Sequence, residues 1–475
     1  MNFQPTDEQQ AIFDAVEGTT ENLTLVARAG AAKTTTLTGT RQGELAGVVQ
    51  RLPQKKRVLC LAFNKAIAEE MVKRIPANAE ARTLNSLGFR ALGRFLPKWP
   101  LLRENKLYTI MRDMDYHGDS EAFGEILQAC KLAKAIGYIN HPMCRSLVDE
   151  HELFEALPLE YEAADKQFIL KVLDESTRWV FEENVVDFAD QLLISTLHKS
   201  IAFDRYDVVL VDEAQDLSAL NHAMVKKLVK GKTRLIVAGD PLQAIYGFRG
   251  AHEQSMEELS TMFNCTELKL CTTFRCAKSI VEHVQWLAPD MVAWEGASQG
   301  QIEDIGDDWE LNDVPEGSAI LCRRNAPLMY LSLEFFLAGI NAEYVGHDTL
   351  FAIERVLKGL KNPRARQPEV KRFINDWIER NKRKYKDSNY YDDMGQCLHL
   401  LTDRFQTLRE INSFIRSQKH ATGRIKLMTV HKAKGLEFDT SFVLNQELFG
   451  EGGQELNIQY VAKTRSRENL FYIEG

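Results

Sequence analysis

The chain has 475 residues and a mass of 54.1 kDa, more than one hydrophobic core usually serves, so we expect at least two domains. Hydrophobic residues make up 44% and charged residues 27% of the sequence, proportions that exclude a disordered or collagen-like chain. The formal net charge of −8 and the isoelectric point of about 5.9 give no general reason to expect a nucleic acid as partner.

The sequence shows no signal for export or for a membrane partner. Its first residues, MNFQPTDEQQ, lack the basic flank and apolar core of a signal peptide, and no later run approaches the length of a membrane span. The eight cysteines form no C-x-x-C pair and lack histidines at zinc-finger spacing. We therefore expect a soluble protein, cytoplasmic or nucleoid-associated, with reduced thiols.

Short apolar runs, each followed by a turn and a helical pattern, predict βα units and a parallel sheet in the first part of the chain. The predicted strands are 22–26, 57–63, 206–211 and 234–238. A helix is predicted over 65–74, with Ile67, Met71 and Ile75 on one face. Helical patterns without strand signals from 91 to 185 predict an insertion into this first domain.

A second α/β region is expected from about residue 268. Its predicted strands are 319–322, 426–429 and 441–444. The predicted organisation is therefore two α/β cores with helical insertions: 1–90 and 186–267 for the first core, 91–185 for its insertion, 268–350 and 421–475 for the second core, and 351–420 for a smaller, basic insertion.

The second insertion holds the one marked charge anomaly. Between residues 355 and 386 there are twelve Lys or Arg residues against Glu369, Asp376 and Glu379. Such a run usually forms a solvated helix face. Contacts with nucleic-acid phosphates, from Lys382, Arg383 and Lys384 among others, are an equally open interpretation.

A phosphate-binding loop is predicted at 27–35, directly after a strand and before a helix. Backbone N–H groups would cradle the phosphates, Lys33 would reach the β and γ phosphates, and Thr34 would bind magnesium. Ala32 stands where the usual pattern has glycine, so its Cβ is expected to crowd the backbone. An Ala-rich helix start is the competing interpretation. The predicted nucleotide-binding residues here are Ala29, Gly30, Ala31, Ala32, Lys33, Thr34 and Thr35.

An apolar strand ending in Asp212 and Glu213 adds a second signal. Asp212 can enter the magnesium shell and Glu213 can activate a water, as metal-assisted hydrolysis of a phosphoanhydride demands. Acidic residues after a strand are also common helix caps. Together with the upstream Lys–Thr pair, however, they predict an ATP hydrolase that requires Mg²⁺.

With these motifs the sequence resembles the UvrD/Rep-like branch of superfamily 1 DNA helicases, from about residue 5 to the end. The motifs that carry the resemblance follow the family order: PTDEQ at 5–9, AFNKA at 62–66, TLNSL at 83–87, DFADQLL at 187–193, DEAQD at 212–216, GDPLQAIYGFRGA at 239–251, LCTTFR at 270–275, TVHKAKGLEF at 429–438 and YVAKTR at 460–465. The residues at 62–65 and 273–275 are more similar to those of the F-box DNA helicase branch.

The resemblance implies two RecA-like parallel-sheet cores and a role for individual residues. It implies that Gln9 reads adenine, that Phe274 stacks on it, and that Glu437 contacts the ribose. The γ phosphate or its attacking water would be contacted by Glu213, Gln243, Arg275 and Arg465. The residues implied to bind DNA are Phe63, Asn64, Asn85, Ser86, Tyr246, Phe248, Arg249, Thr429 and His431. Aromatic faces and arginine suit this task because they stack on bases or contact phosphates.

The implied function is an ATP- and Mg²⁺-dependent motor that moves 3′ to 5′ on single-stranded DNA and unwinds at junctions with duplex, with an accessory or loading protein as a further partner. Three departures qualify it: Ala31 and Ala32 in the phosphate loop, Asn85 in place of histidine, and a second insertion smaller than the family's, with few residues after Arg465. Two alternatives therefore stay open: a translocase that strips proteins from DNA and unwinds weakly, and an ATP-gated DNA-binding subunit that does not hydrolyse ATP.

Overall fold

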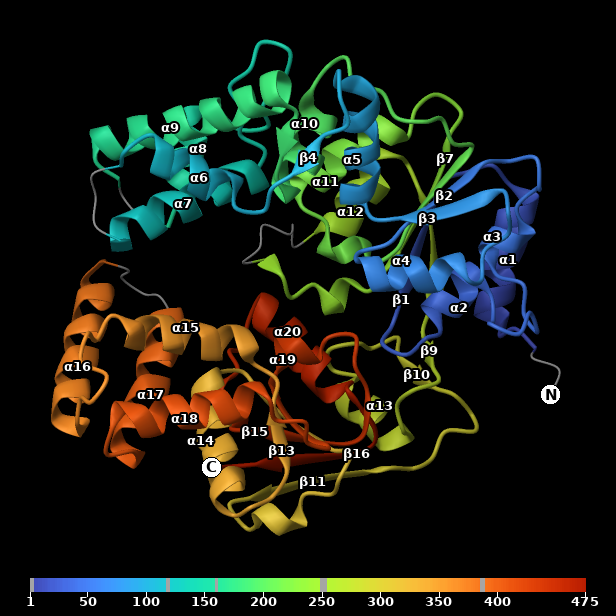
Figure 1. Cartoon of the computed structure of the whole chain (residues 1–475). Helices are drawn as coiled ribbons and strands as arrows, with labels where there is room; N and C mark the ends of the chain where they lie inside the picture. The colour runs from blue at the N-terminus through green and yellow to red at the C-terminus, as the bar shows by residue number, and fades with distance from the viewer. Residues whose placement is uncertain (1–3, 117–119, 159–160, 248–253, 385–388) are drawn as a thin grey trace. The chain divides into compact units, whose positions relative to one another are not determined.

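The computed structural model describes residues 4–116, 120–158, 161–247, 254–384 and 389–475 (Figure 1). The chain divides into two compact units. One comprises Met1–Ala27 and Ala32–Cys271, and the other comprises Arg28–Ala31 and Thr272–Gly475. Among the described residues, no helix combines the length and the apolarity needed to cross a bilayer.

The first unit is built on a six-stranded parallel sheet in the order β3-β2-β6-β7-β1-β8. Its strands are β1 Leu23–Ala27, β2 Val58–Leu61, β3 Ala79–Arg82, β6 Val208–Val211, β7 Arg234–Gly239 and β8 Thr266–Leu270. The four central strands are buried along their whole length, which explains their continuous apolar runs. The four predicted strands of this region are confirmed.

Helices connect these strands and cover the sheet. They are α1 Asp7–Gly18, α2 Lys33–Thr38, α3 Val48–Arg51, α4 Lys65–Val72, α5 Leu84–Phe95, α10 Phe188–Leu197, α11 Ala219–Leu228 and α12 Ser255–Met262. The helix predicted over 65–74 is α4, which ends at Val72. It buries Met71 as expected, whereas Ile67 is half-buried and Ile75 lies after the helix. Its first turn is capped by Asn64, whose side chain accepts a hydrogen bond from the Ile67 amide.

The helical insertion of this unit consists of α6 Lys106–Asp113, α7 Ser120–Ala135, α8 Glu150–Ala156 and α9 Ala163–Arg178, followed by a short π-helix at Trp179–Glu183. Figure 1 shows these helices as a separate lobe beside α5 and α10. The expectation of a strand-free insertion is wrong in one detail. Strands β4 Leu101–Leu102 and β5 Val185–Val186 pair in parallel, and two-residue strands are too short to produce a periodic signal.

The second unit has its own six-stranded parallel sheet, in the order β11-β16-β15-β12-β14-β13. Its strands are β11 Gln301–Gly306, β12 Ala319–Cys322, β13 Ala342–Tyr344, β14 Ile425–Thr429, β15 Phe438–Leu444 and β16 Ser466–Ile473. The three predicted strands are β12, β14 and β15. The predicted α/β class with two parallel-sheet cores is confirmed.

The second unit begins slightly later than residue 268, where we expected it. Strand β8 pairs with β1 at the edge of the first sheet, so Leu268 belongs to the first unit. The remaining elements of the second unit are β9 Thr272–Thr273, β10 Val292–Ala293, α13 Lys278–Val284, α14 Asn325–Leu337, α15 His347–Lys358, α16 Gln367–Lys384, α17 Asn389–Arg404, α18 Leu408–Lys419, α19 Val430–Ala433 and α20 Gln454–Lys463. Helices α15 to α18 form its helical insertion.

Candidate nucleotide and DNA sites

The predicted phosphate loop lies between β1 and α2. Ala32 occupies the N-cap position of α2, with φ 54° and ψ 31°. This is a left-handed conformation, which the glycine usual at this position adopts without cost. An alanine held there costs about 1–2 kcal/mol. The expected conflict between the Ala32 Cβ and the backbone is therefore present, and the loop keeps the left-handed turn despite it. Lys33, Thr34 and Thr35 follow in the first turn of α2.

The preceding loop residues pack within the second unit. A Cβ added at Gly30, where φ is +74°, would lie 2.4 Å from Cβ of Arg275, so the loop needs glycine at this position. The Gly30 carbonyl accepts a hydrogen bond from the Phe274 amide at 2.9 Å, and the Ala29 amide donates to the Tyr460 hydroxyl at 2.9 Å. Ala31 is buried, and its amide bonds the Arg28 carbonyl.

The acidic pair lies where the lysine of the loop can reach it. Lys33 Nζ is 3.0 Å from Asp212 Oδ1 and 2.6 Å from Glu213 Oε1. Burial alone would lower the pKa of Lys33, but the two carboxylates outweigh burial and raise it, so the ammonium stays charged. Burial raises the pKa of Asp212, and Lys33 opposes that rise. The geometry therefore joins the two sequence signals in one site of the first unit.

Hydrogen bonds extend this site to the GDPLQ motif. Gln215 Nε2 donates to Glu213 Oε2 at 2.5 Å, and Gln215 Oε1 accepts from the Asp240 amide at 3.1 Å. Gln243 Nε2 in turn donates to Asp240 Oδ2 at 2.7 Å. A Cβ at Gly239 would lie 2.3 Å from Gln215 Oε1, so glycine at the end of β7 makes room for the bridging amide.

Gln215 and Asp240 had no predicted role. Both stand inside motifs that the sequence shows, but only the fold reveals that their side chains connect the acidic pair to Gln243. Glu213 itself adopts φ 53° and ψ 41°, an unusual conformation for a side chain of this size. Backbone strain of this kind is found at functional sites more often than elsewhere.

Gln9 lies in the first turn of α1, and its fully buried side chain reaches α2. Its Oε1 accepts from the Thr6 amide at 3.1 Å, and its Nε2 donates to Thr36 Oγ1 at 2.9 Å. Both ends of the amide thus bond residues of the first unit, and reading adenine stays a prediction for this residue.

The predicted DNA-binding residues of the first unit follow the ends of β2, β3 and β7. Phe63 is 43% exposed, and its ring stacks on that of Tyr246, with centroids 6.2 Å apart and planes 3° from parallel. Asn85 Nδ2 donates to the Phe188 carbonyl at 2.9 Å, and Ser86 lies in the same turn of α5. Phe248 and Arg249 lie outside the described residues.

A small pocket of about 140 Å³ lies between this region and Asp212. Its lining includes Phe63 and Asn85 together with the buried Asp212. The exposed aromatic Phe188, which begins α10 beside Asn85, is a further residue to which we had assigned no role. An aromatic residue in the DFADQLL motif is the signal that could have identified it.

In the second unit, Arg275 Nε is 2.8 Å from Glu437 Oε2, and Arg275 Nη1 donates to the Thr464 carbonyl. Phe274 is exposed, with its ring 6.2 Å from that of Trp294. Phe274, Arg275 and Glu437 therefore lie close together in the second unit, and their contacts with a nucleotide stay predictions. Thr429 caps α19, which contains His431.

Arg465 is enclosed in the second unit. Its side chain is fully buried, and the guanidinium donates to the carbonyls of Val461 and Leu436 and to the Thr464 hydroxyl. These bonds point the guanidinium into the interior of the second unit. Contact with a γ phosphate stays a prediction for this residue.

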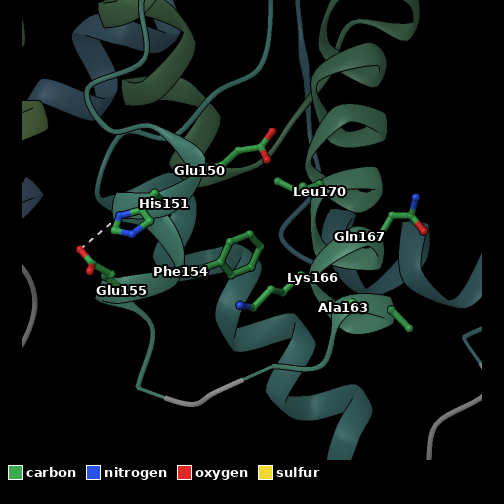
Figure 2. A pocket seen from close by; sticks show the side chains of 9 residues that line it. Glu150, His151, Phe154, Glu155, Ala163, Lys166, Gln167 and Leu170 are labelled. Atoms are coloured by element: carbon green, nitrogen blue, oxygen red, sulfur yellow. Dashed lines mark ion pairs between the residues drawn. The ribbon is translucent and has the colours of Figure 1, made fainter.

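A wider groove of about 770 Å³ lies between α8 and α9 (Figure 2). Phe154 and Leu170 line it, and His151 pairs with Glu155 at its edge. None of the residues predicted for ATP or DNA is among its lining residues.

Comparison with known proteins shows which family the sequence resembles. The description "UvrD/REP helicase N-terminal domain" matches residues 6–264, more than half of the chain, and "UvrD-like helicase C-terminal domain" matches residues 361–474. F-box DNA helicase protein 1 of Schizosaccharomyces pombe is 23% identical over 518 residues, covering 98% of this chain and 57% of that protein. Gabija protein GajB of Bacillus cereus is 24% identical over 344 residues, covering 60% of this chain and 68% of GajB. ATP-dependent DNA helicase Rep of Escherichia coli is 34% identical over 107 residues, 21% of this chain and 16% of Rep.

Proposed function

Since the chain belongs to the UvrD/Rep helicase family, we propose that it is an ATP-dependent motor that moves 3′ to 5′ along single-stranded DNA and unwinds duplex at junctions. The observation that carries the proposal is the contact of Lys33 with both Asp212 and Glu213, in a unit that also presents the stacked rings of Phe63 and Tyr246. The first unit thus contains both the charged residues proposed for ATP hydrolysis and the aromatic rings proposed to stack on DNA bases.

The donor set of the site fits ATP with Mg²⁺. The hydroxyl of Thr34 and the carboxylate of Asp212 are oxygen ligands of the kind that Mg²⁺ prefers. Lys33 supplies a charged donor for phosphate oxygens and would exchange its present carboxylate partners for them. Bound magnesium would neutralise charge on the phosphates.

Glu213 is the base in this proposal. Its partner Gln215 fixes one carboxylate oxygen, which leaves the group oriented to accept a proton from a water. Because Gln215 also bonds Asp240, and Asp240 bonds Gln243, a change at Glu213 is passed to the loop that carries Tyr246. The stack of Tyr246 on Phe63 then connects ATP turnover with the surface proposed for DNA.

Binding of single-stranded DNA would not depend on base sequence. Aromatic side chains at the surface, Phe63, Tyr246 and Phe188, offer faces on which any base can stack. Asn85 and Ser86 lie beside them with side chains suited to the sugar-phosphate backbone.

The proposal is tested by steady-state ATP hydrolysis with and without single-stranded DNA, and by strand displacement on duplexes with a 3′ or a 5′ tail. We expect hydrolysis that DNA stimulates and unwinding from the 3′ tail. Hydrolysis that is absent or indifferent to DNA would contradict the proposal, and unwinding from the 5′ tail alone would reverse its polarity.

Glu213→Gln is the sharpest variant because it removes the base and keeps the magnesium carboxylate. We expect kcat to fall by about 10²–10⁴-fold, with binding of a fluorescent ATP analogue retained. The matched control is Glu69→Gln, which changes an exposed glutamate whose partner is Lys65 on the surface of α4. It should leave kcat unchanged.

The non-hydrolysing alternative rests on Ala32. Ala32 adopts a left-handed conformation that glycine would also adopt, so alanine does not prevent this turn, which supports hydrolysis. DNA binding that responds to ATP without release of phosphate would favour the alternative. A protein-stripping translocase is distinguished by rapid displacement of a DNA-bound protein together with slow unwinding of bare duplex.

A further inference from the structure

Four charged side chains are buried together in the first unit, apart from the residues assigned to ATP and DNA. They are Lys106, Lys134, Asp187 and Asp190, whose side chains are 0%, 2%, 9% and 1% exposed. Lys106 Nζ is 2.7 Å from Asp190 Oδ2, and Lys134 Nζ is 2.6 Å from both Asp187 Oδ2 and Asp190 Oδ1. We call these four residues the ionic cage.

The cage joins the helical insertion to α10. Lys106 begins α6 and Lys134 lies in the last turn of α7, both in the insertion. Asp187 is the cap of α10, and its Oδ1 accepts from the Asp190 amide at 2.8 Å. The β4–β5 pair places the chain before Lys106 beside the chain before Asp187. Ser176 of α9 completes the set, since its hydroxyl accepts from Lys134 at 3.0 Å and its carbonyl from Lys106 at 2.6 Å.

The cage contains two lysines and two aspartates, so its formal charges balance. Burial raises the pKa of Asp187 and lowers the pKa of Lys106, and the opposite charges beside them act against both shifts. Burial alone would raise the pKa of Asp190, but Lys106 and Lys134 outweigh it and lower that pKa to about 2. Buried ion pairs of this kind seldom stabilise a fold more than apolar residues of the same size would. The distinct property of the cage is its directional geometry, which fixes α6, α7 and α9 against the first turn of α10.

The first turn of α10 contacts α5, the helix that carries the predicted DNA-binding residues Asn85 and Ser86. The carbonyl of Phe188 accepts from Asn85 Nδ2 at 2.9 Å. One turn further along α5, a Cβ added at Gly88 would lie 2.0 Å from the carbonyl oxygen of Gln191 in α10. Helices α5 and α10 therefore touch backbone to backbone, and the position of α10 sets the position of the Asn85 side chain.

We propose that the ionic cage is a positioning device through which the helical insertion holds the DNA-binding end of α5. The proposal rests on the proposed function, since it assumes that Asn85 contacts single-stranded DNA. The cage residues themselves touch neither DNA nor ATP and act through α10.

The test variant is Lys134→Met/Asp187→Asn in the full chain. It removes one positive and one negative charge, leaves Lys106 paired with Asp190, and keeps a capping side chain because asparagine caps helices as well as aspartate does. We expect the Kd for a fluorescent oligo(dT) to rise about tenfold, while the Kd for an ATP analogue stays within twofold. An oligo(dT) Kd within twofold of wild type would overturn the proposal.

The matched control loosens the other end of α10. Lys227 Nζ donates to the carbonyls of Ser195, Thr196 and His198, the last turn of that helix and the residue after it. Lys227→Met should lower the thermal unfolding midpoint and leave the oligo(dT) Kd unchanged. Equal loss of DNA affinity in both variants would reduce the cage to a general stabilising contact and overturn the proposal.

A milder variant covers the case in which the double variant does not fold. Ser176→Ala removes the hydroxyl that accepts from Lys134 and keeps all four charges. It should raise the oligo(dT) Kd two- to threefold, and an unchanged Kd would again overturn the proposal. Wild-type protein that binds no oligo(dT) would contradict the proposed function itself, which separates the two failures.

Discussion

The two helical insertions attach to their units through buried carboxylates in different ways. In the first unit, Asp187 and Asp190 at the start of α10 are neutralised by lysines of α6 and α7. In the second, Asp393 of α17 lies at the start of α14, where it accepts from the Asn325 and Ala326 amides at 2.9 and 2.8 Å and from Asn325 Nδ2 at 2.8 Å. One attachment uses ion pairs and the other uses neutral N–H donors.

This difference determines how much stability each attachment loses when one partner is removed by substitution. A buried ion pair leaves an uncompensated charge when one partner is removed, whereas removal of a helix cap leaves neutral donors without acceptors. Two charge pairs of the second insertion, Lys371 with Asp403 and Lys382 with Asp392, lie instead on its surface. Its interior is apolar, with Ile374 and Leu398 fully buried.

The largest effect is expected from Lys134→Met alone. Removal of this lysine leaves Asp187 without its ammonium in the interior, so the free energy of unfolding should fall by about 3–5 kcal/mol. Urea denaturation followed by circular dichroism measures the loss. Lys131→Met, an exposed lysine on the same helix, is the control and should stay within about 0.5 kcal/mol of wild type. A loss below about 1 kcal/mol would show that the cage charges are screened or neutralised.

A smaller loss is expected from Asp393→Ala in the second insertion. The substitution leaves the Asn325 and Ala326 amides without their acceptor, at a cost of about 1–3 kcal/mol. Its neighbour Asp392 is paired with Lys382 at the surface, so Asp392→Ala should cost less than about 1 kcal/mol. If Asp393→Ala cost as much as Lys134→Met, the two attachments would be energetically alike and the comparison would fail.

Much of the fold could be predicted because its signals are local. The buried central strands appear as continuous apolar runs, and βα alternation indicates parallel sheets. The Lys33–Asp212–Glu213 site could also be predicted, because both of its parts follow strands and the ends of parallel strands meet at one edge of a sheet.

The remaining features depend on contacts between distant residues. Nothing in the neighbourhood of Lys106 indicates that Asp190 is its partner, and the burial of Arg465 follows from carbonyls that only the folded backbone brings together. The acidic partners of two lysines in the basic segment 355–386 could not be predicted for the same reason, because they lie on another helix. Counting charges from 355 to 386 leaves out Asp392 and Asp403, which pair with its lysines from the next helix.

The smallest effect concerns that segment and decides between its two interpretations. Lys382 and Asp392 have side chains 56% and 47% exposed, so Lys382→Ala should change the free energy of unfolding by less than about 1 kcal/mol. Because Asp392 already neutralises Lys382, we also expect the slope of log Kd for oligo(dT) against log salt to stay unchanged. Asp439→Ala, which removes the exposed partner of Arg467, controls for the loss of one surface pair. A slope reduced by about one unit would instead identify Lys382 as a phosphate ligand, because DNA releases about one counterion for each phosphate that a lysine neutralises.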